Sequence, residues 1–124
     1  MKAIALILAI LSATPTAALA QNPLSIMGGD GSFLGIITPD KYNKNSICNQ
    51  YGAYGGKYNP HSIFNEYGTY GGKYSDLGAY SEIAQHPPLI VLDGQVVGVI
   101  SKNPNIGNSS DRVDPDVLLA YVCG

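Results

Sequence analysis

Residues 41–56 read KYNKNSICNQYGAYGG, and residues 57–72 read KYNPHSIFNEYGTYGG. The two segments agree at eleven of sixteen positions without a gap, and residues 73–80, KYSDLGAY, begin a third copy. Agreement at a fixed period predicts one supersecondary unit that is repeated and stacked on itself. We therefore expect residues 41–80 to form a glycine- and tyrosine-rich tandem repeat with a period of 16 residues.

The local conformation of the repeat is predicted from its glycines and polar residues. Ile47, Tyr51, Tyr54 and Tyr58 have the spacing of one helix face, but the three glycines among them would each cost a helix about 1 kcal/mol relative to alanine. The pattern favours short helical turns at Ser-Ile-Cys-Asn and Ser-Ile-Phe-Asn, capped by serine or the preceding polar residue. Glycine-hinged extended segments would join them, and Asn59-Pro60 would start a turn.

The tyrosines of the repeat fit two arrangements. Eight of the nine tyrosines lie between Tyr42 and Tyr80. In one arrangement, Ile47, Ile63 and some tyrosines form an internal ladder with the hydroxyl groups at its rim. In the other, the tyrosines form an open face for sugar rings or an extended peptide, since tyrosine offers contact area at low entropic cost. The candidate binding residues are Tyr51, Tyr54, Tyr58, Tyr67, Tyr70 and Tyr74.

The first twenty residues have the pattern of an export signal. Lys2 precedes the apolar run of residues 3–11, and Ala18-Leu19-Ala20 has the small-x-small pattern that signal peptidase cleaves. Pro15 interrupts the run, whereas a membrane anchor needs about 20 apolar residues, and Gln21 stands where a lipoprotein needs cysteine. We expect residues 1–20 to be cleaved and residues 21–124 to form one domain, secreted or periplasmic.

The charge of the expected mature chain limits its partners. After cleavage it has six basic and nine acidic side chains, for a formal charge of about −3. Nucleic acid or an anionic membrane as the main partner would favour a basic surface. The remaining candidate partners are a cell-wall glycan or an envelope protein.

Cys48 and Cys123 are the only two cysteines. In an oxidising compartment an even number of cysteines indicates disulfide bonding. A bond between them would close a loop of about 75 residues and stabilise the fold by roughly 4 kcal/mol in the chain-entropy model. The alternative is a reactive thiol paired with His61 or His86.

A β-hairpin is the strongest local signal outside the repeat. Two mainly apolar runs, residues 89–92 and 95–101, flank Asp93-Gly94, which is the preferred pair of a type I′ turn. Residues 33–38, FLGIIT, match residues 96–101, VVGVIS, in form. We expect these two segments to pair in one sheet.

Two further elements complete the predicted fold. Residues 32–37 form a β-rich run, and Asp114 and Pro115 suit the N-cap and first residue of a helix that runs through Tyr121. The sequence predicts a small, single-domain, β-rich α+β fold. It contains a short sheet, the tandem repeat, a short C-terminal helix and one disulfide.

No motif in the sequence assigns a catalytic residue, a metal or a cofactor. Gly56-Lys57 resembles part of a phosphate-binding loop, but Tyr51 and Tyr58 occupy the positions where that loop needs glycine and Ser or Thr. His61 and His86 lie 25 residues apart, without a second ligand at metal-site spacing.

Other polar residues have structural explanations. The repeated serines, Ser46, Ser62 and Ser81, suit backbone capping. Acidic residues are favoured near a helix start, which explains Asp111, Asp114 and Asp116. Four oxygen donors that could bind calcium do not have the spacing of an EF-hand loop: Asp40, Asn43, Asn45 and Ser46.

The phrases SICNQYGAYGGKY and SIFNEYGTYGGKY lie between FLGIIT and PPLIVLDGQVVGVIS. Over residues 33–101 this order resembles small exported bacterial proteins of unknown function with Ser-Ile-x-Asn and Tyr-Gly-x-Tyr-Gly tandem repeats. The resemblance implies an exported compartment and a repeat architecture, and it assigns no catalytic residue. The third copy departs from the pattern, with Gly78-Ala79-Tyr80-Ser81 where Ser-Ile-x-Asn would stand.

The expected function is that of a non-enzymatic binding or structural protein of the cell envelope or secretome. The alternative is a small extracytoplasmic hydrolase or metal-dependent enzyme. Exposed tyrosines in a shared groove would favour binding, whereas a pocket that joins His61 or His86 to Asp or Ser would favour the enzyme.

Overall fold

In the computed structural model, which describes residues 22–124, Asp93 and Gly94 join β3 (Leu89–Leu92) to β4 (Gln95–Ile100). The two strands are antiparallel. Both turn residues have positive φ, 51° at Asp93 and 78° at Gly94, as a type I′ turn requires. The predicted hairpin is confirmed.

The sheet has five strands in the order β2-β1-β3-β4-β5. β1 (Ser25–Met27) is antiparallel to both β2 (Phe33–Ile36) and β3, whereas the two-residue β5 (Arg112–Val113) runs parallel to β4. The expected pairing of residues 33–38 with residues 96–101 is therefore wrong. Three-residue β1 was missed because it is too short to show a strand pattern, yet its Ile26 is fully buried.

The C-terminal helix α2 (Pro115–Cys123) begins as predicted and ends two residues beyond Tyr121. Asp114 is its N-cap, and the Asp114 side chain accepts a hydrogen bond from the backbone N–H of Asp116 at 2.8 Å. This bond satisfies one of the free donors at the helix start. No helix within residues 22–124 is long and apolar enough to cross a membrane.

The predicted disulfide between Cys48 and Cys123 is present, with the two Cα atoms 5.3 Å apart. It attaches the last residue of α2 to the first copy of the repeated sequence. The described chain holds no free cysteine, so the reactive-thiol alternative is wrong. The expected export signal, residues 1–20, and Gln21 lie outside the described residues.

Between β2 and β3 the chain forms a succession of turns at three-residue steps. Backbone N–H groups of Ser46, Asn49 and Gly52 donate to the carbonyl oxygens of the residues three positions earlier, at 3.0 to 3.2 Å. The side chains of Asn43, Ser46 and Asn49 also accept from the N–H two residues ahead, at 2.8 to 3.0 Å. Asn and Ser favour turns because they can make this local bond.

The same bonds recur sixteen residues later. The side-chain oxygens of Asn59, Ser62 and Asn65 accept a hydrogen bond from the N–H two residues ahead, and their carbonyl oxygens accept from the N–H three residues ahead. Ser75 and Ser81 also make the side-chain bond. The expected caps are correct, but the helical turns are not: residues 41–86 form isolated turns, with one β-bridge from Ser46 to Ile36.

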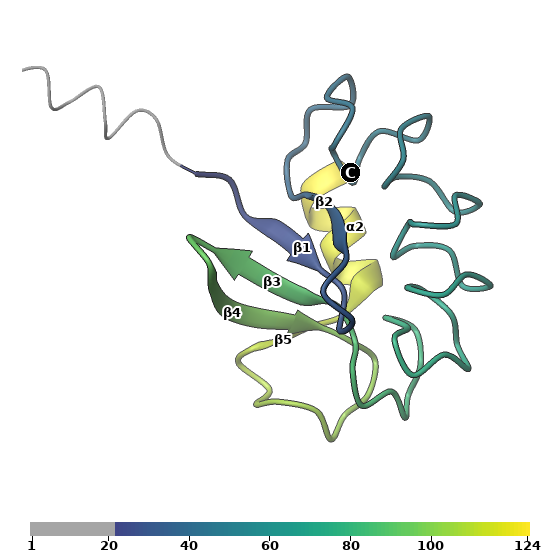
Figure 1. The fold of residues 1–124 in the computed structure, drawn as a ribbon, viewed down its shortest axis with the longest axis vertical. Helices are drawn as coiled ribbons and strands as arrows, with labels where there is room; N and C mark the ends of the chain where they lie inside the picture. The colour runs from purple at the N-terminus through teal and green to yellow at the C-terminus, as the bar shows by residue number, and fades with distance from the viewer. Residues whose placement is uncertain (1–21) are drawn as a thin grey trace, which may run out of the picture.

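One hydrophobic core joins the turns, the sheet and α2. Ile47, Ile63 and Ala79, sixteen residues apart, are each at most 1% exposed, and the next residues, Cys48, Phe64 and Tyr80, are also buried. They belong to one cluster with Ile26, Leu34 and Leu118. In Figure 1 the turns form a row of loops beside the sheet, with α2 along the inner side of that row.

Candidate functional site

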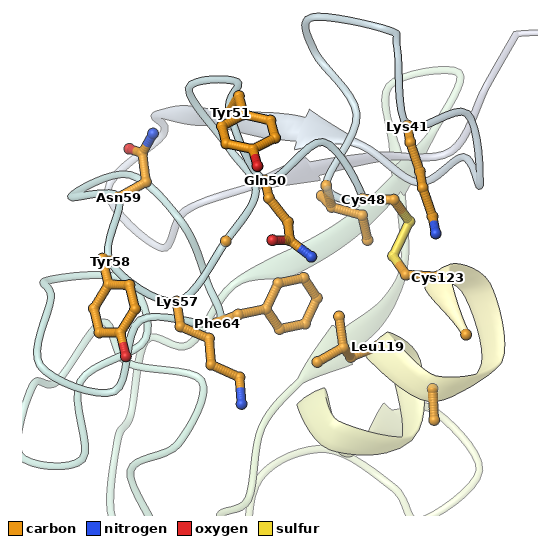
Figure 2. Close-up of a pocket in the computed structure, with 14 residues that line it drawn as sticks. Lys41, Cys48, Gln50, Tyr51, Lys57, Tyr58, Asn59, Phe64, Leu119 and Cys123 are labelled. Carbon is orange, nitrogen blue, oxygen red and sulfur yellow. A yellow bond between two sulfur atoms is a disulfide. The ribbon is translucent and has the colours of Figure 1, made fainter.

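A cleft of about 580 Å³ lies between the turns of residues 41–64 and the C-terminal half of α2. Figure 2 shows its residues as sticks. The volume is within the range of small-ligand sites in proteins. Its lining divides into an apolar floor and a polar rim.

The floor of the cleft is apolar. Ile47 and Phe64 come from the turns, and Leu119 and Cys123 come from successive turns of α2. Phe64 is only 2% exposed, and its backbone N–H donates to the Ser62 side chain at 3.1 Å. The disulfide closes one end, so turns and helix keep a fixed separation at this place.

Tyr51 and Tyr58 line the rim and are 98% and 88% exposed. Each ring can therefore contact a ligand without first leaving the core. The Tyr51 backbone is held by the bond from its N–H to the Asn49 side chain at 3.0 Å. Asn59, which also lines the cleft, donates its side-chain N–H to the Gly52 carbonyl at 2.7 Å.

The other predicted binding tyrosines lie elsewhere. Tyr54 packs edge-on against Phe33, with ring centroids 5.1 Å apart. The Tyr70 hydroxyl donates to Asp30 Oδ2 at 2.9 Å, so both half-buried rings brace the turns against the β1–β2 segment. Tyr67 is exposed but does not line this cleft, and Tyr74 lines a second cleft, which lies nearer the start of α2. The structure thus brings together only Tyr51 and Tyr58 of the six.

Two lysines on the rim were not among the predicted site residues. The side chains of Lys41 and Lys57 border the cleft together with Gln50. Neither lysine makes an ion pair within residues 22–124. No Asp or Glu side chain lines this cleft, so the two charged side chains of its rim are both positive; Gly124, the last residue of the printed sequence, lines it as well.

A second cleft lies nearer the start of α2, and both of its lysines, Lys73 and Lys102, are in ion pairs. Lys102 Nζ lies 2.9 Å from Asp114 Oδ2 and 3.0 Å from Asp116 Oδ2. The Tyr80 hydroxyl donates to Asp116 Oδ1 at 2.8 Å, and Lys73 pairs with Glu66 at 3.1 Å. Burial raises the pKa of Asp116, but the bonds from Lys102 and Tyr80 more than offset this, so its pKa is lowered.

Tyr80 should make folding sensitive to alkaline pH. Desolvation by burial, and then the bond to Asp116, raise the pKa of Tyr80 above its ordinary value. The stabilisation from neutral Tyr80 is complete below the unfolded-state pKa of about 10 and is lost as pH rises towards the higher folded-state pKa. In urea unfolding at pH 8 and pH 11, Tyr80→Phe should show a smaller fall in midpoint than wild type. Tyr42→Phe, at a 95% exposed ring, is the control; equal falls in all three proteins would contradict the prediction.

The histidines and serines considered for catalysis line neither cleft. His86 Nδ1 lies 2.6 Å from Asp76 Oδ2, and this bond lowers the pKa of Asp76. Both side chains are more than half exposed, and the His61 ring stacks on Tyr70. The hydroxyl oxygens of Ser46, Ser62 and Ser81 accept backbone hydrogen bonds in turns.

The calcium candidates have the same local role. Asp40 and Asn43 accept the N–H groups of Tyr42 and Asn45. Across the part of the chain that the structure describes, no three His, Cys, Asp or Glu side chains group as a metal site.

Three comparisons with known proteins gave no match. No family model matches the chain, and neither the search of curated proteins nor that of solved structures found a similar protein. The chemistry of the first cleft is therefore the main basis for a functional proposal.

Proposed function

We propose that the chain is exported, that cleavage follows Ala20, and that the mature domain is a non-enzymatic protein that binds a cell-envelope glycan in the first cleft. Export is supported by the signal pattern of residues 1–20, by the resemblance to small exported bacterial proteins, and by a disulfide, which suits an oxidising compartment.

The observation that carries the proposal is the exposure of Tyr51 and Tyr58 beside an apolar floor. The face of a sugar ring presents C–H groups that pack against aromatic and aliphatic surfaces. The tyrosine hydroxyls can exchange hydrogen bonds with sugar hydroxyls. An apolar floor with a few polar groups at the rim is the usual composition of a small-ligand site.

The bonds that hold the walls of the cleft support binding as well. Tyr51 and Tyr58 stand on turns that their neighbouring asparagines hold by hydrogen bonds, and the disulfide fixes α2 opposite them. A preorganised site loses less conformational freedom on binding, so more of the contact energy appears as affinity.

The alternative is a small extracytoplasmic hydrolase, and the pair of His86 and Asp76 is the observation that favours it. An Asp-His pair orients a general base in many hydrolases. We rank this function second because the pair borders neither cleft. An envelope protein that inserts a side chain between Tyr51 and Tyr58 is the other possible occupant.

A thermal-shift screen of the oxidised mature domain tests the proposal. Chitotetraose, peptidoglycan fragments, tetragalacturonate, calcium and zinc serve as probes. A glycan at ten times its Kd should raise Tm by roughly 5 °C, and the double variant Tyr51→Ala, Tyr58→Ala should lose this shift. Its own Tm should stay close to that of wild type, because both rings are exposed.

Tyr67→Ala is the matched control, since Tyr67 is 90% exposed and does not line the first cleft. It should retain the full glycan shift. No shift with any glycan, or an equal loss of the shift in Tyr67→Ala, would reject the proposed site. A shift with zinc or calcium alone would favour the metal-dependent alternative.

A further inference from the structure

We infer that the glycan of the first cleft is acidic, and that a carboxylate on the sugar pairs with Lys57. This inference rests on the proposed function and adds the chemical class of the ligand. It starts from a difference between two copies of the repeated sequence.

Lys57 and Lys73 stand at the same position of successive copies. Lys73 Nζ lies 3.1 Å from Glu66 Oε1, and the hydrogen bond to Glu66 raises the pKa of Lys73. The residue that corresponds to Glu66 in the first copy is Gln50. The partner that neutralises Lys73 is thus replaced at Lys57 by a neutral amide, and Gln50 and Lys57 both line the cleft.

The Asp116 carboxylate, whose charge interacts with that of Lys57, already binds two other groups. Lys57 contributes to the lowered pKa of Asp116, but the Asp116 oxygens bind Lys102 and Tyr80. Asp116 lines the second cleft and not the first. The ammonium group of Lys57 therefore remains available to an anion that enters the first cleft.

Lys41 adds a second positive charge to the same rim. In Figure 2 it lies near Cys123, at the C-terminal end of α2, where helix carbonyls carry partial negative charge. Part of the charge of Lys41 is offset there, whereas Lys57 lies beside Tyr58 and Phe64, away from Cys123. Lys57 is accordingly the main partner of the ligand.

The sugar part of the ligand follows from the surroundings of Lys57. A free inorganic anion would leave Tyr58 and Leu119 without a partner, whereas an acidic sugar ring uses the ammonium group and this apolar surface together. Although the expected mature chain is acidic overall, this rim is locally positive. Local charge, more than net charge, decides which ligand enters a cleft.

Isothermal titration at low salt tests the inference with tetragalacturonate and its methyl ester. The two probes share their rings, and only the first carries carboxylates. Wild type should bind the acid roughly three- to tenfold more tightly, as expected for exposed ion pairs. Raising the salt to about 0.5 M should reduce this ratio, because exposed charges are screened.

Gln50→Glu recreates the pair of Glu66 and Lys73 beside Lys57, so the ratio of acid to ester affinity should fall to about one. Lys57→Gln should have the same effect without a new negative charge. The matched control is Glu66→Gln, which changes the same position of the second copy outside the first cleft, and it should keep the wild-type ratio. Circular dichroism checks that each variant is folded.

Equal binding of acid and ester by wild type would overturn the inference and leave glycan binding intact. A preference for the acid that survives in both Gln50→Glu and Lys57→Gln would also overturn it. Binding of neither probe, together with no shift in the glycan screen, would reject the proposed function itself. If inorganic phosphate binds the first cleft as tightly as tetragalacturonate does, the sugar ring contributes nothing to the affinity, and the inference of an acidic sugar would be overturned.

Discussion

Replacing Cys48 and Cys123 with serine should lower the free energy of unfolding by about 4 kcal/mol. The bond joins residues 75 positions apart, and a crosslink over a loop of this length removes much of the conformational freedom of the unfolded chain. Urea unfolding of the oxidised wild type and the double variant measures the difference. An expected mature domain of 104 residues has a total stability of only about 5–15 kcal/mol, so the loss is a large fraction.

Wild type treated with dithiothreitol is the control, since it loses the same crosslink without a change of sequence. It should match the double variant to within about 1 kcal/mol. The variant should also lose glycan binding, because Cys48 and Cys123 hold the turns and α2 together at the end of the cleft. A difference in stability of less than about 1 kcal/mol would contradict the expected role of the bond.

Gly71→Ala should destabilise the domain by roughly 3 kcal/mol. A Cβ atom at Gly71 would lie 2.2 Å from the carbonyl oxygen of Asn65 and 2.7 Å from that of Ile63. Both are backbone atoms beside buried turns, so the chain must shift to relieve the contact, at the cost typical of overpacking a core. Gly55, sixteen residues earlier, lies in the same close contact with Asn49.

Gly68→Ala is the matched comparison for Gly71→Ala. A Cβ atom at Gly68 would meet only the side chain of Asn65, at 3.1 to 3.4 Å, so a small movement of that side chain relieves the contact. We expect a loss of about 1 kcal/mol or less, measured by the same urea unfolding. Equal losses of stability in the two variants would show that the fold does not depend on close backbone packing at Gly71.

Local signals predicted the hairpin, the helix start and the disulfide. Asp93-Gly94 and Asp114-Pro115 each determine the conformation of their own residues, so neighbours in sequence suffice to identify them. The position of β2 depends on the insertion of three-residue β1 beside β3, a tertiary contact with no local pattern. For this reason the pairing of Phe33–Ile36 with β4 was predicted wrongly.

The turns show the same limit. Ser46 and Ser62 accept backbone N–H groups as expected of capping residues, but one side-chain bond to the backbone can cap either a helix or an isolated turn. The glycines that follow favour turns over a helix only because the backbone is in close contact there, as at Gly71 and Asn65. Those contacts depend on how successive turns lie against one another.

The candidate site could be predicted only in part. The sequence contains many tyrosines, but turns have no regular periodicity that says which side chains face the core. The sequence therefore could not separate exposed Tyr51 and Tyr58 from half-buried Tyr54 and Tyr70. The signal for Lys57 was present as the substitution of Gln50 for Glu66 between copies. This substitution could be interpreted as the loss of an ion-pair partner only when the structure showed the ion pair of Glu66 with Lys73.

The most direct test of the proposed glycan site is a map of amide chemical-shift changes in the ¹⁵N-labelled mature domain during titration with tetragalacturonate. The largest changes should occur at Tyr51, Lys57, Tyr58 and Leu119, which surround the first cleft. The hairpin tip around Val96 should not respond. Changes centred on the hairpin or on His86, with none around Lys57, would contradict the account.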